Sequence, residues 1–214
     1  MRQKIGQEQR HAEILACAAR LFRERSVGAV AIDEIVREAN IAKGTFYLYF
    51  RSKSDLLARL ADALVARMVE AAEAAARQQA DPLDNFAAAV AALKHVDRDE
   101  RHLAEALHHP ANLELHERAN IALVRGLAPV LAGVVEAGNA TGVFDVAAPL
   151  PTVEFLLAGQ AFLLGDGRFN WSPAEHAERL DAALVLIERA LGAPPRSLTT
   201  RLAQALAPPA VPAG

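Results

Sequence analysis

The stretch AIDEIVREANIAKGTFYLYFRSKSDLL, from Ala31 to Leu57, predicts two short helices joined by a tight turn. The first is expected near Ile32 to Ala39, and the second over about Lys43 to Tyr49. Asn40 stands at the turn, and asparagine tolerates the left-handed backbone better than most non-glycine residues. This arrangement is typical of a helix-turn-helix. Its small shared core would consist of Ile35, Val36, Ala39, Ile41, Phe46 and Phe50.

With those side chains facing inward, the second helix presents Lys43, Thr45, Tyr47 and Tyr49 outward. Such a helix fits the major groove of DNA, where some side chains hold phosphate and others read base edges. Gly44 lets the backbone approach closely. Lys53 lies at the start of the next helix, where free amides and the helix dipole attract phosphate.

The alternative is that these aromatic residues form the core of a helical bundle. Phe46 and Phe50 fit that role. Both tyrosines cannot share it, because the four aromatic side chains would then point around more than half of the helix. The residues alone therefore favour DNA binding without excluding the bundle.

Helical periodicity continues on both sides of the motif. A helix from about Glu8 to Arg25 carries the apolar stripe Ile14, Leu15, Ala18, Leu21 and Phe22. A long helix is expected from near Ser54 to about Gln79, with Ser52 and Ser54 as candidate caps. Further helices fit residues 82–96, 102–108, 113–136, 153–164 and 173–191, and Gly138, Asn139 and Gly142 are expected in a loop.

Composition favours an all-α protein of about nine helices. Alanine is abundant, aromatic residues make up 5% of the chain, and the alternating β-branched runs of sheets are absent. We divide the chain into a helix-turn-helix domain at 1–55, with its motif at about 33–52, a larger helical domain at 56–193 and a tail at 194–214. Five of the 11 prolines lie between Pro194 and Pro212, so a loosely held tail is expected, with one turn of helix around Thr200 to Leu206.

Charge is distributed unevenly along the chain. The net charge is −3, yet residues 1–59 hold 11 Lys/Arg against 7 Asp/Glu, and residues 60–214 hold 12 against 19. A basic front and an acidic remainder fit a DNA-binding module on a body that phosphates repel, although ordinary fluctuation would also produce this difference.

Several classes of protein are disfavoured. The single cysteine, Cys17, allows no internal disulfide and no multi-thiolate zinc site. The polar start lacks the apolar segment of a signal peptide, and we expect no membrane span and a cytoplasmic protein. Glycine-rich phosphate loops, a G-x-S-x-G elbow and a metalloprotease histidine pair are absent, so an enzyme is not expected.

Residues 10–60 resemble the DNA-binding domain of the TetR family of transcriptional regulators. The resemblance is carried by I-x-E-I-V-x-E-A-N-I-A-K-G-T-F-Y-x-Y-F-x-S-K-x-D-L-L, preceded by the first-helix pattern I-L-x-x-A-x-x-L-F. It implies a three-helix DNA-binding head followed by a helical domain for ligand binding and dimerisation. It also implies that Lys43, Thr45, Tyr47 and Tyr49 face DNA, and that Lys53 clamps backbone phosphate.

Three residues depart from the family pattern. Ala31 and Ala42 stand where threonine and serine usually cap the two short helices, and Asn40 replaces the more frequent turn glycine. The loss of a cap costs about 1 kcal/mol, so the head is expected to be softer than average. None of the three removes a phosphate donor from the second helix.

The last two helices are the expected dimer interface. One short helix contacts only a few base pairs, so two heads one or more DNA turns apart are needed to read a palindrome. The alternative is that these apolar stripes pack only within the chain, and the family resemblance favours a four-helix bundle across a twofold axis. The expected interface residues are Val153, Leu156, Leu157, Gln160, Leu164, Leu180, Leu184, Ile187 and Leu191.

The resemblance further implies a ligand pocket among the middle helices. A mostly apolar lining suits a small hydrophobic effector, although apolar residues at helical spacing are more often plain core. No cofactor is expected. The candidate lining residues are Phe86, Val90, Leu93, Leu103, Leu107, Leu127, Phe162 and Trp171.

Histidines recur every seven residues at His95, His102, His109 and His116, and imidazole suits zinc or a related metal. Pro110 and the polar cluster at 97–101 prevent one continuous helix from aligning them, so no metal site is expected.

The function expected from these patterns is a homodimeric repressor that a small hydrophobic ligand releases from a palindromic operator. A transcriptional activator on the same scaffold and a helical interaction protein that does not bind DNA remain as alternatives.

Overall fold

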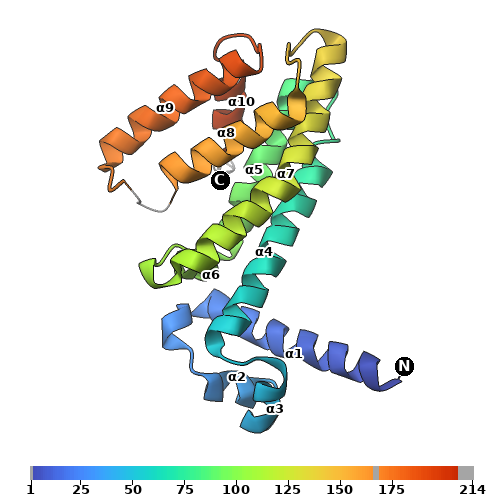
Figure 1. Ribbon diagram of the computed structural model, residues 1–214, viewed down its shortest axis with the longest axis vertical. Coiled ribbons are helices and arrows are strands. Elements are labelled where there is room, and N and C mark those ends of the chain that lie inside the picture. The colour runs from blue at the N-terminus through green and yellow to red at the C-terminus, as the bar shows by residue number, and fades with distance from the viewer. Residues whose placement is uncertain (1, 166–168, 207–214) are drawn as a thin grey trace, which may run out of the picture. The chain divides into compact units, whose positions relative to one another are not determined.

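The computed structural model describes residues 2–165 and 169–206, and this part of the chain is helical throughout (Figure 1). It contains ten α-helices, two short 3-10 helices and no strand, which confirms the all-α prediction and adds one helix to the expected number. The described residues divide into two compact units. The first comprises those of Met1–Val65 and Asp97–Ala119, and the second those of Ala66–Val96 and Asn120–Gly214.

The first unit holds the predicted helix-turn-helix. Its elements are α1 (Arg2–Glu24), the 3-10 helix η1 (Val27–Ala29), α2 (Ile32–Glu38), α3 (Lys43–Tyr49), the beginning of α4 (Lys53–Ala75), α6 (Arg101–Leu107) and the 3-10 helix η2 (Pro110–Asn112). α1 begins before the expected Glu8, and α3 has the bounds predicted for it. The apolar stripes of these helices meet in one core, whose members include Ile14, Ala18, Phe22, Ile35, Phe46 and Phe50.

α6 packs against α1 and η1 within this unit. The contact includes an ion pair in which Nε of Arg23 on α1 lies 2.8 Å from Oε1 of Glu100, the residue before α6. Glu100 is buried, whereas Arg23 is half exposed. The carboxylate therefore ties the chain at the start of α6 to the end of α1.

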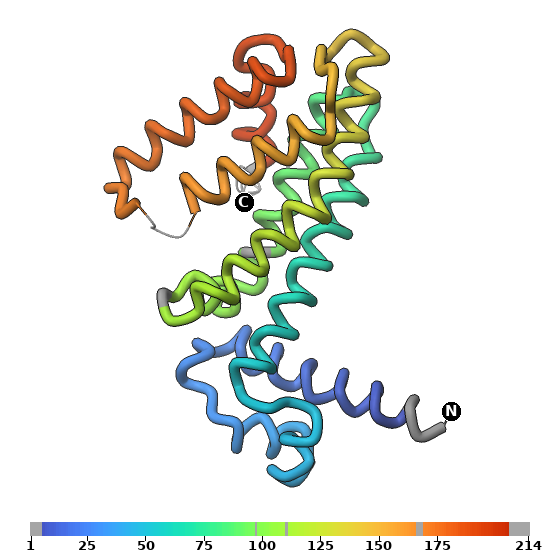
Figure 2. Tube along the Cα trace, in the orientation of Figure 1, coloured from blue at the N-terminus to red at the C-terminus, as the bar shows by residue number. Residues whose placement is uncertain are grey.

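The second unit is built around α7 (Leu113–Thr141), with the second half of α4, α5 (Pro82–Asp99), α8 (Pro149–Leu164), α9 (Pro173–Ala190) and α10 (Ser197–Leu206). The Cα trace in Figure 2 shows α8 and α9 side by side. α7 is the one helix of the described residues that is long and apolar enough to cross a membrane by length and composition alone. Its Leu127, Leu131 and Val135 are buried in the core of this unit, as expected of the central helix of a folded domain.

α7 extends past the loop that was expected at Gly138 and Asn139. Both residues belong to the helix because they dock the chain that follows it. A Cβ atom at Gly138 would lie 2.0 Å from Cδ2 of Phe144, so only glycine admits this ring. The Asn139 side chain donates to the carbonyl of Val146 and accepts from its amide, at 2.8 and 3.1 Å. The turn itself uses Gly142, at φ +74°.

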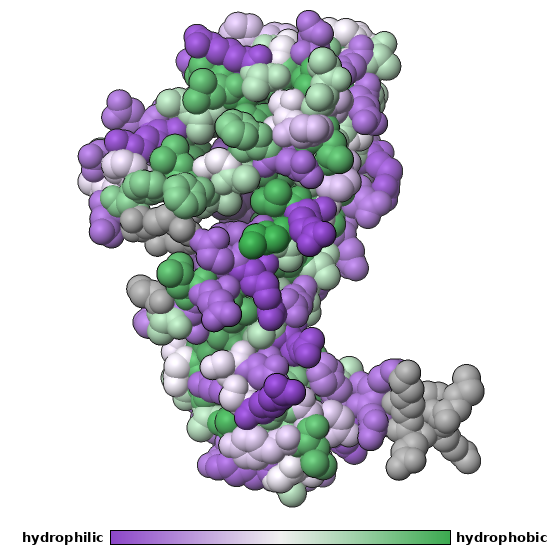
Figure 3. Space-filling view, in the orientation of Figure 1, coloured by the Kyte–Doolittle hydropathy of each residue, from purple (hydrophilic) through white to green (hydrophobic). Residues whose placement is uncertain are grey.

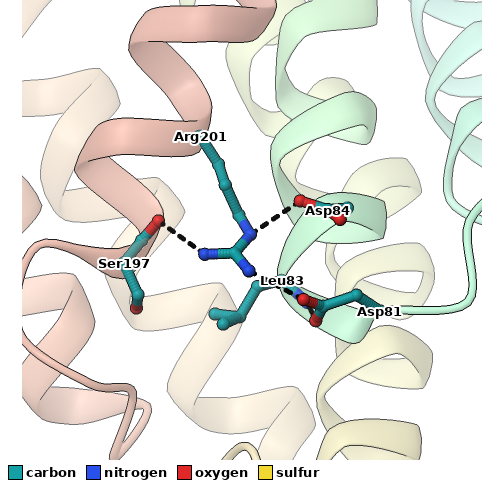
Figure 4. A network of polar contacts seen from close by, with 5 residues as sticks. All are labelled: Asp81, Leu83, Asp84, Ser197 and Arg201. Carbon is teal, nitrogen blue, oxygen red and sulfur yellow. Dashed lines mark hydrogen bonds and ion pairs between the residues drawn. The ribbon is translucent and has the colours of Figure 1, made fainter.

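The described part of the predicted tail, residues 194–206, is packed more firmly than its prolines suggested, and residues 207–214 of that tail lie outside the described residues. α10 begins at Ser197 and buries Leu198 and Leu202. Arg201 joins it to the start of α5 (Figure 4), with Nε 2.6 Å from Oδ1 of Asp84 and an amino nitrogen 2.7 Å from Oδ2 of Asp81. A third nitrogen of the guanidinium donates to the carbonyl of Ser197 at 3.3 Å.

Glu188 on α9 supports the chain that leads into α10. Its buried carboxylate accepts from the amide of Arg196 at 2.7 Å, and from the amide and hydroxyl of Thr199 at 2.9 and 3.0 Å. Burial by itself raises the pKa of Glu188, but these hydrogen bonds outweigh it and hold the pKa below the ordinary glutamate value. Composition alone did not reveal these long-range contacts.

Candidate nucleic-acid interface

The turn between α2 and α3 is fixed by its own backbone. Asn40 adopts φ 50°, as predicted from its tolerance of the left-handed region. The next amide, of Ile41, donates to the carbonyl of Val36 at 2.9 Å. The reversal is visible in the Cα trace of Figure 2. These constraints set the direction in which α3 leaves the turn.

α3 is anchored by one face and exposed on the other. Phe46 is fully buried, and its ring lies 5.4 Å from that of Phe50, which is also buried. On the opposite side Leu48 is 82% exposed, and the neighbouring Tyr47 is 48% exposed. The second helix of the motif therefore offers a free surface to a partner.

The residues predicted to face outward are not equally free. Lys43 and Gly44 are exposed, whereas Thr45 and Tyr49 are half buried. The Tyr49 ring lies 6.5 Å from the ring of His11 on α1, which itself stacks on Phe50 at 4.8 Å. Tyr47 is thus the more accessible tyrosine, and Tyr49 lies at the border with α1.

Lys43 forms an ion pair with the preceding helix. Its Nζ lies 2.7 Å from Oδ1 of Asp33 on α2, and both side chains are exposed. This hydrogen bond, with the charge of the carboxylate, raises the pKa of Lys43 above its ordinary value. Exposed pairs of this kind contribute little to stability, so the ammonium can exchange Asp33 for a phosphate oxygen.

Lys53 does not point freely into solvent. Its Nζ donates to the carbonyls of Val27 and Val30, each at 2.5 Å, and so holds the chain around η1 against the start of α4. Burial lowers the pKa of Lys53. An ammonium group has three N–H donors. A phosphate contact by Lys53 would therefore use the third donor while the other two brace the fold.

The starts of α2 and α3, where alanine replaces a capping side chain, differ in how their backbone amides are satisfied. At α2, the Glu34 carboxylate accepts from the amide of Ala31 at 3.0 Å and thus supplies half of a capping box. That bond, and then one from Arg25 at 2.6 Å, lower the pKa of Glu34. At α3, Ala42 provides no side-chain cap. The start of α3 keeps the uncapped amides that the sequence suggested.

Three residues on or beside α3 were not among the predicted contacts. Leu48 was overlooked because an apolar side chain does not suggest a polar partner. Arg51 and Arg59 are exposed and help to line an open depression of about 480 Å³ at the end of α3. Its lining residues are Tyr47, Leu48, Tyr49, Phe50, Arg51, Asp55 and Arg59. The surface thus combines an exposed apolar side chain with two cations and a carboxylate.

The predicted ligand residues fall into three groups. Phe86 and Leu127 are buried in the core of the second unit, with Val90 and Leu93 packed against it. Leu103 and Leu107 are buried in the first unit. Phe162 is 54% exposed, and Trp171 is half buried, with Nε1 donating to the carbonyl of Leu163.

The predicted interface stripe lies mostly inside the chain. Val153, Ile187 and Leu191 are buried in the core of the second unit, and Leu156 and Leu157 pack against it. Gln160, Leu164 and Leu184 are half buried, whereas Leu180 is exposed. The two helices also expose apolar residues, most of which lie outside that stripe, and apolar side chains reach the surface along α8 in Figure 3. These residues are Leu150, Phe155, Phe162 and Leu163 on α8, and Leu180, Val185 and Leu186 on α9.

The recurring histidines do not converge on a metal centre. Nδ1 of His116 lies 3.3 Å from the carbonyl oxygen of Leu107, and Nδ1 of His102 lies 3.2 Å from Oε2 of Glu105. Across the described chain, no three His, Cys, Asp or Glu side chains are placed to hold a metal ion together.

Sequence comparison assigns both parts of the chain to one family. Residues 14–60 match the profile of bacterial regulatory proteins of the tetR family. Residues 94–184 match the tetracyclin repressor-like C-terminal domain. The transcriptional regulator EthR of Mycolicibacterium smegmatis is 38% identical over 60 residues, which cover 28% of this chain and 28% of EthR. That match therefore spans less than a third of the relative.

Solved structures share the fold over most of the chain. RolR in complex with resorcinol gives a TM-score of 0.64 at 23% identity, covering 97% of each chain. FadR from Bacillus subtilis in complex with stearoyl-CoA gives 0.56 at 20% identity, covering 84% of this chain and 98% of FadR. At these identities the likeness concerns the arrangement of helices.

Proposed function

Because the chain belongs to the TetR family of bacterial transcriptional regulators, we propose that it is a homodimeric repressor that releases a palindromic operator on binding a small hydrophobic ligand. The observation that carries this proposal is the free face of α3. One side of this short helix is locked by Phe46, while Tyr47 and Leu48 are available to a partner. A rigid, exposed helix after a tight turn is the form in which proteins read the major groove.

Gly44 supports DNA as the partner. A glycine in a helix costs about 1 kcal/mol relative to alanine. No contact among the described residues requires it, since a Cβ atom at this position would meet no atom within 4 Å and the backbone has no positive φ. An external surface that approaches the backbone closely accounts for glycine at this position.

The charged side chains near α3 suit phosphate. Arg51 and Arg59 are exposed beside it, and Lys43 is held only by an exposed carboxylate. Residues 1–59 carry four more basic than acidic side chains, whereas the rest of the chain has an acidic excess. Such a distribution steers the head toward DNA and keeps the body away from it.

The exposed face of α8 and α9 supports dimerisation. Phe155 is 79% exposed one turn before Ala158 and Gly159, and Phe162 follows at the same helical face. Exposed phenylalanines flanking small residues allow a second copy to pack closely. We therefore place the interface on this face rather than on the predicted stripe that includes Val153, Ile187 and Leu191.

The effector would bind in the second unit. Its core includes apolar side chains of α5 and α7, among them Phe86, Val90, Leu93 and Leu127, which would suit an apolar molecule. RolR and FadR, which share the fold, were solved with resorcinol and with stearoyl-CoA. Release requires that the ligand bind more tightly to a form in which the two heads no longer match the operator.

We further propose that the protein acts in the cytoplasm and is not an enzyme.

The test is binding to the DNA beside the chain's own coding region. Full-length protein should bind one such fragment specifically. The logarithm of the binding constant should fall steeply with the logarithm of the salt concentration, because phosphate contacts release counterions. A reporter under the same DNA distinguishes a repressor from an activator by the sign of its response. Absence of salt-sensitive binding to any fragment, with dimers intact, would instead favour a helical interaction protein.

A further inference from the structure

Leu48 occupies the most outward position of α3. An α-helix turns by about 100° per residue, so positions 44 and 48 both lie nearly opposite position 46. Phe46 is fully buried, which fixes the inward direction, and Leu48 is 82% exposed. Gly44, one turn earlier on the same face, leaves open space where a side chain would stand. Leu48 is therefore the side chain that projects farthest along the outward axis of this helix.

The neighbours of Leu48 identify the class of its partner. A single exposed leucine is ordinary on a protein surface. This one lies in a depression that also includes Arg51 and Arg59, and it adjoins the exposed Tyr47. An exposed apolar side chain close to two cations and a hydroxyl suits a groove that has phosphates along its rims and an apolar group on its floor, and Asp55 is the one carboxylate in the same lining.

We propose that Leu48 selects thymine in the operator half-site by contact with the C5 methyl group. In the major groove, thymine alone presents this methyl beside its O4 acceptor, whereas the other bases present only donors and acceptors. Leucine leaves those polar groups unpaired and so disfavours the other bases. This inference rests on the proposed function, since it requires that α3 enter the major groove.

The test removes one methyl group from the DNA and one side chain from the protein. An operator is first selected from random duplexes with the full-length wild-type protein. Each thymine of a half-site is then replaced singly by deoxyuridine, which keeps base pairing but lacks the methyl. Replacement of one thymine should weaken wild-type binding about fourfold, the value of one buried methyl-sized group.

The protein variants assign that effect to its residue. Leu48→Ala should bind the thymine and deoxyuridine duplexes equally, whereas Leu48→Met should keep part of the difference. Ile121→Ala is the control, because Ile121 is an apolar residue on α7 that is 58% exposed, and it should keep the full fourfold difference. Helical circular dichroism and gel filtration establish that each variant is folded and dimeric.

Two results would overturn the inference, and they are distinguishable. If the selected duplex binds but Leu48→Ala retains the wild-type sensitivity to deoxyuridine, or if the wild type shows none, Leu48 does not read thymine and the regulator proposal stands. If no duplex is enriched and no salt-sensitive binding is found, the proposed function fails, and this inference fails with it.

Discussion

Arg23 and Glu100 form an ion pair between α1 and the residue before α6, with Nε 2.8 Å from Oε1. Glu100 is only 3% exposed, so its charge depends on protein partners rather than on water. The pair joins residues separated by 77 positions in the sequence, and it connects α1, the helix that precedes the DNA-binding motif, to the start of α6. Its strength should therefore appear in the stability of the first unit.

Replacement of Arg23 by alanine should lower the free energy of unfolding by about 1–3 kcal/mol, because the buried carboxylate loses a charged donor. Arg20→Ala is the matched control. Arg20 pairs with Glu38, but both side chains are exposed, and a surface pair contributes only about 0–1 kcal/mol. Urea denaturation of both variants measures the difference, and equal losses would contradict the role given to Glu100.

Lys53→Met should destabilise the head by about 1–3 kcal/mol, because the carbonyls of Val27 and Val30 lose their shared donor. Lys43→Met should leave stability nearly unchanged and reduce the salt slope of DNA binding by about one, as expected for one lost phosphate contact. Thermal melting and salt-dependent anisotropy separate the two lysines. A Lys53 variant with wild-type melting would show that the carbonyl contacts contribute nothing.

Tyr47→Phe should weaken operator binding about three- to tenfold and leave folding unchanged. The ring and its edge contact with Phe46, at 5.4 Å between centroids, are retained, and only the exposed hydroxyl is lost. Because a phosphate contact carries no sequence information, the loss should be similar on specific and unrelated duplexes. Binding curves on both DNAs decide this, and an unchanged affinity would remove Tyr47 from the interface.

Phe155→Glu should convert dimers to monomers, because it places a charge at the centre of the exposed α8 face. Ile121→Glu introduces the same charge at another exposed apolar residue and should leave the dimer intact. Sedimentation velocity on both proteins measures the outcome. The proposed interface would be refuted by a dimeric Phe155→Glu protein.

Glu188→Gln should lower stability at neutral pH by about 1–2 kcal/mol, because the amides of Arg196 and Thr199 lose a charged acceptor. The pKa of Glu188 is lower in the folded chain than its ordinary value. The advantage of the wild type is therefore complete above the ordinary glutamate pKa and declines as pH falls through the lower folded value. Unfolding midpoints across acidic pH test this, and a constant difference at all pH values would contradict it.

The helix-turn-helix could be predicted from sequence because its determinants are local. The spacing of Phe46 and Phe50, the turn at Asn40 and the bounds of α3 all follow from residues within one short window. The contacts of Lys53 with Val27 and Val30 could not, since they depend on how η1 folds back onto α4. The position of Lys53 near a helix start suggested a phosphate as its partner, whereas in the structure its ammonium group donates to backbone carbonyls.

The faces of α8 and α9 show a second limit of periodicity. A stripe at helical spacing shows that a face is apolar but not whether it is covered by the same chain. Val153 and Ile187 belong to such stripes and are buried internally, while Phe155 and Leu186 remain exposed. Likewise, Phe162 is as apolar as a pocket residue would be, but its side chain is exposed to solvent. The packing of the whole second unit decides between these outcomes.

The guanidinium of Arg201 serves two helix ends at once, since it binds the first turn of α5 through Asp84 and Asp81 and a carbonyl of α10. A segment as short as α10 is not stable as an isolated helix in water. Fraying of the C-terminal helix therefore also strips the α5 carboxylates of their counter-charge, so amide protons in both segments should become exchangeable together. We therefore expect α10 and the start of α5 to open as one cooperative element.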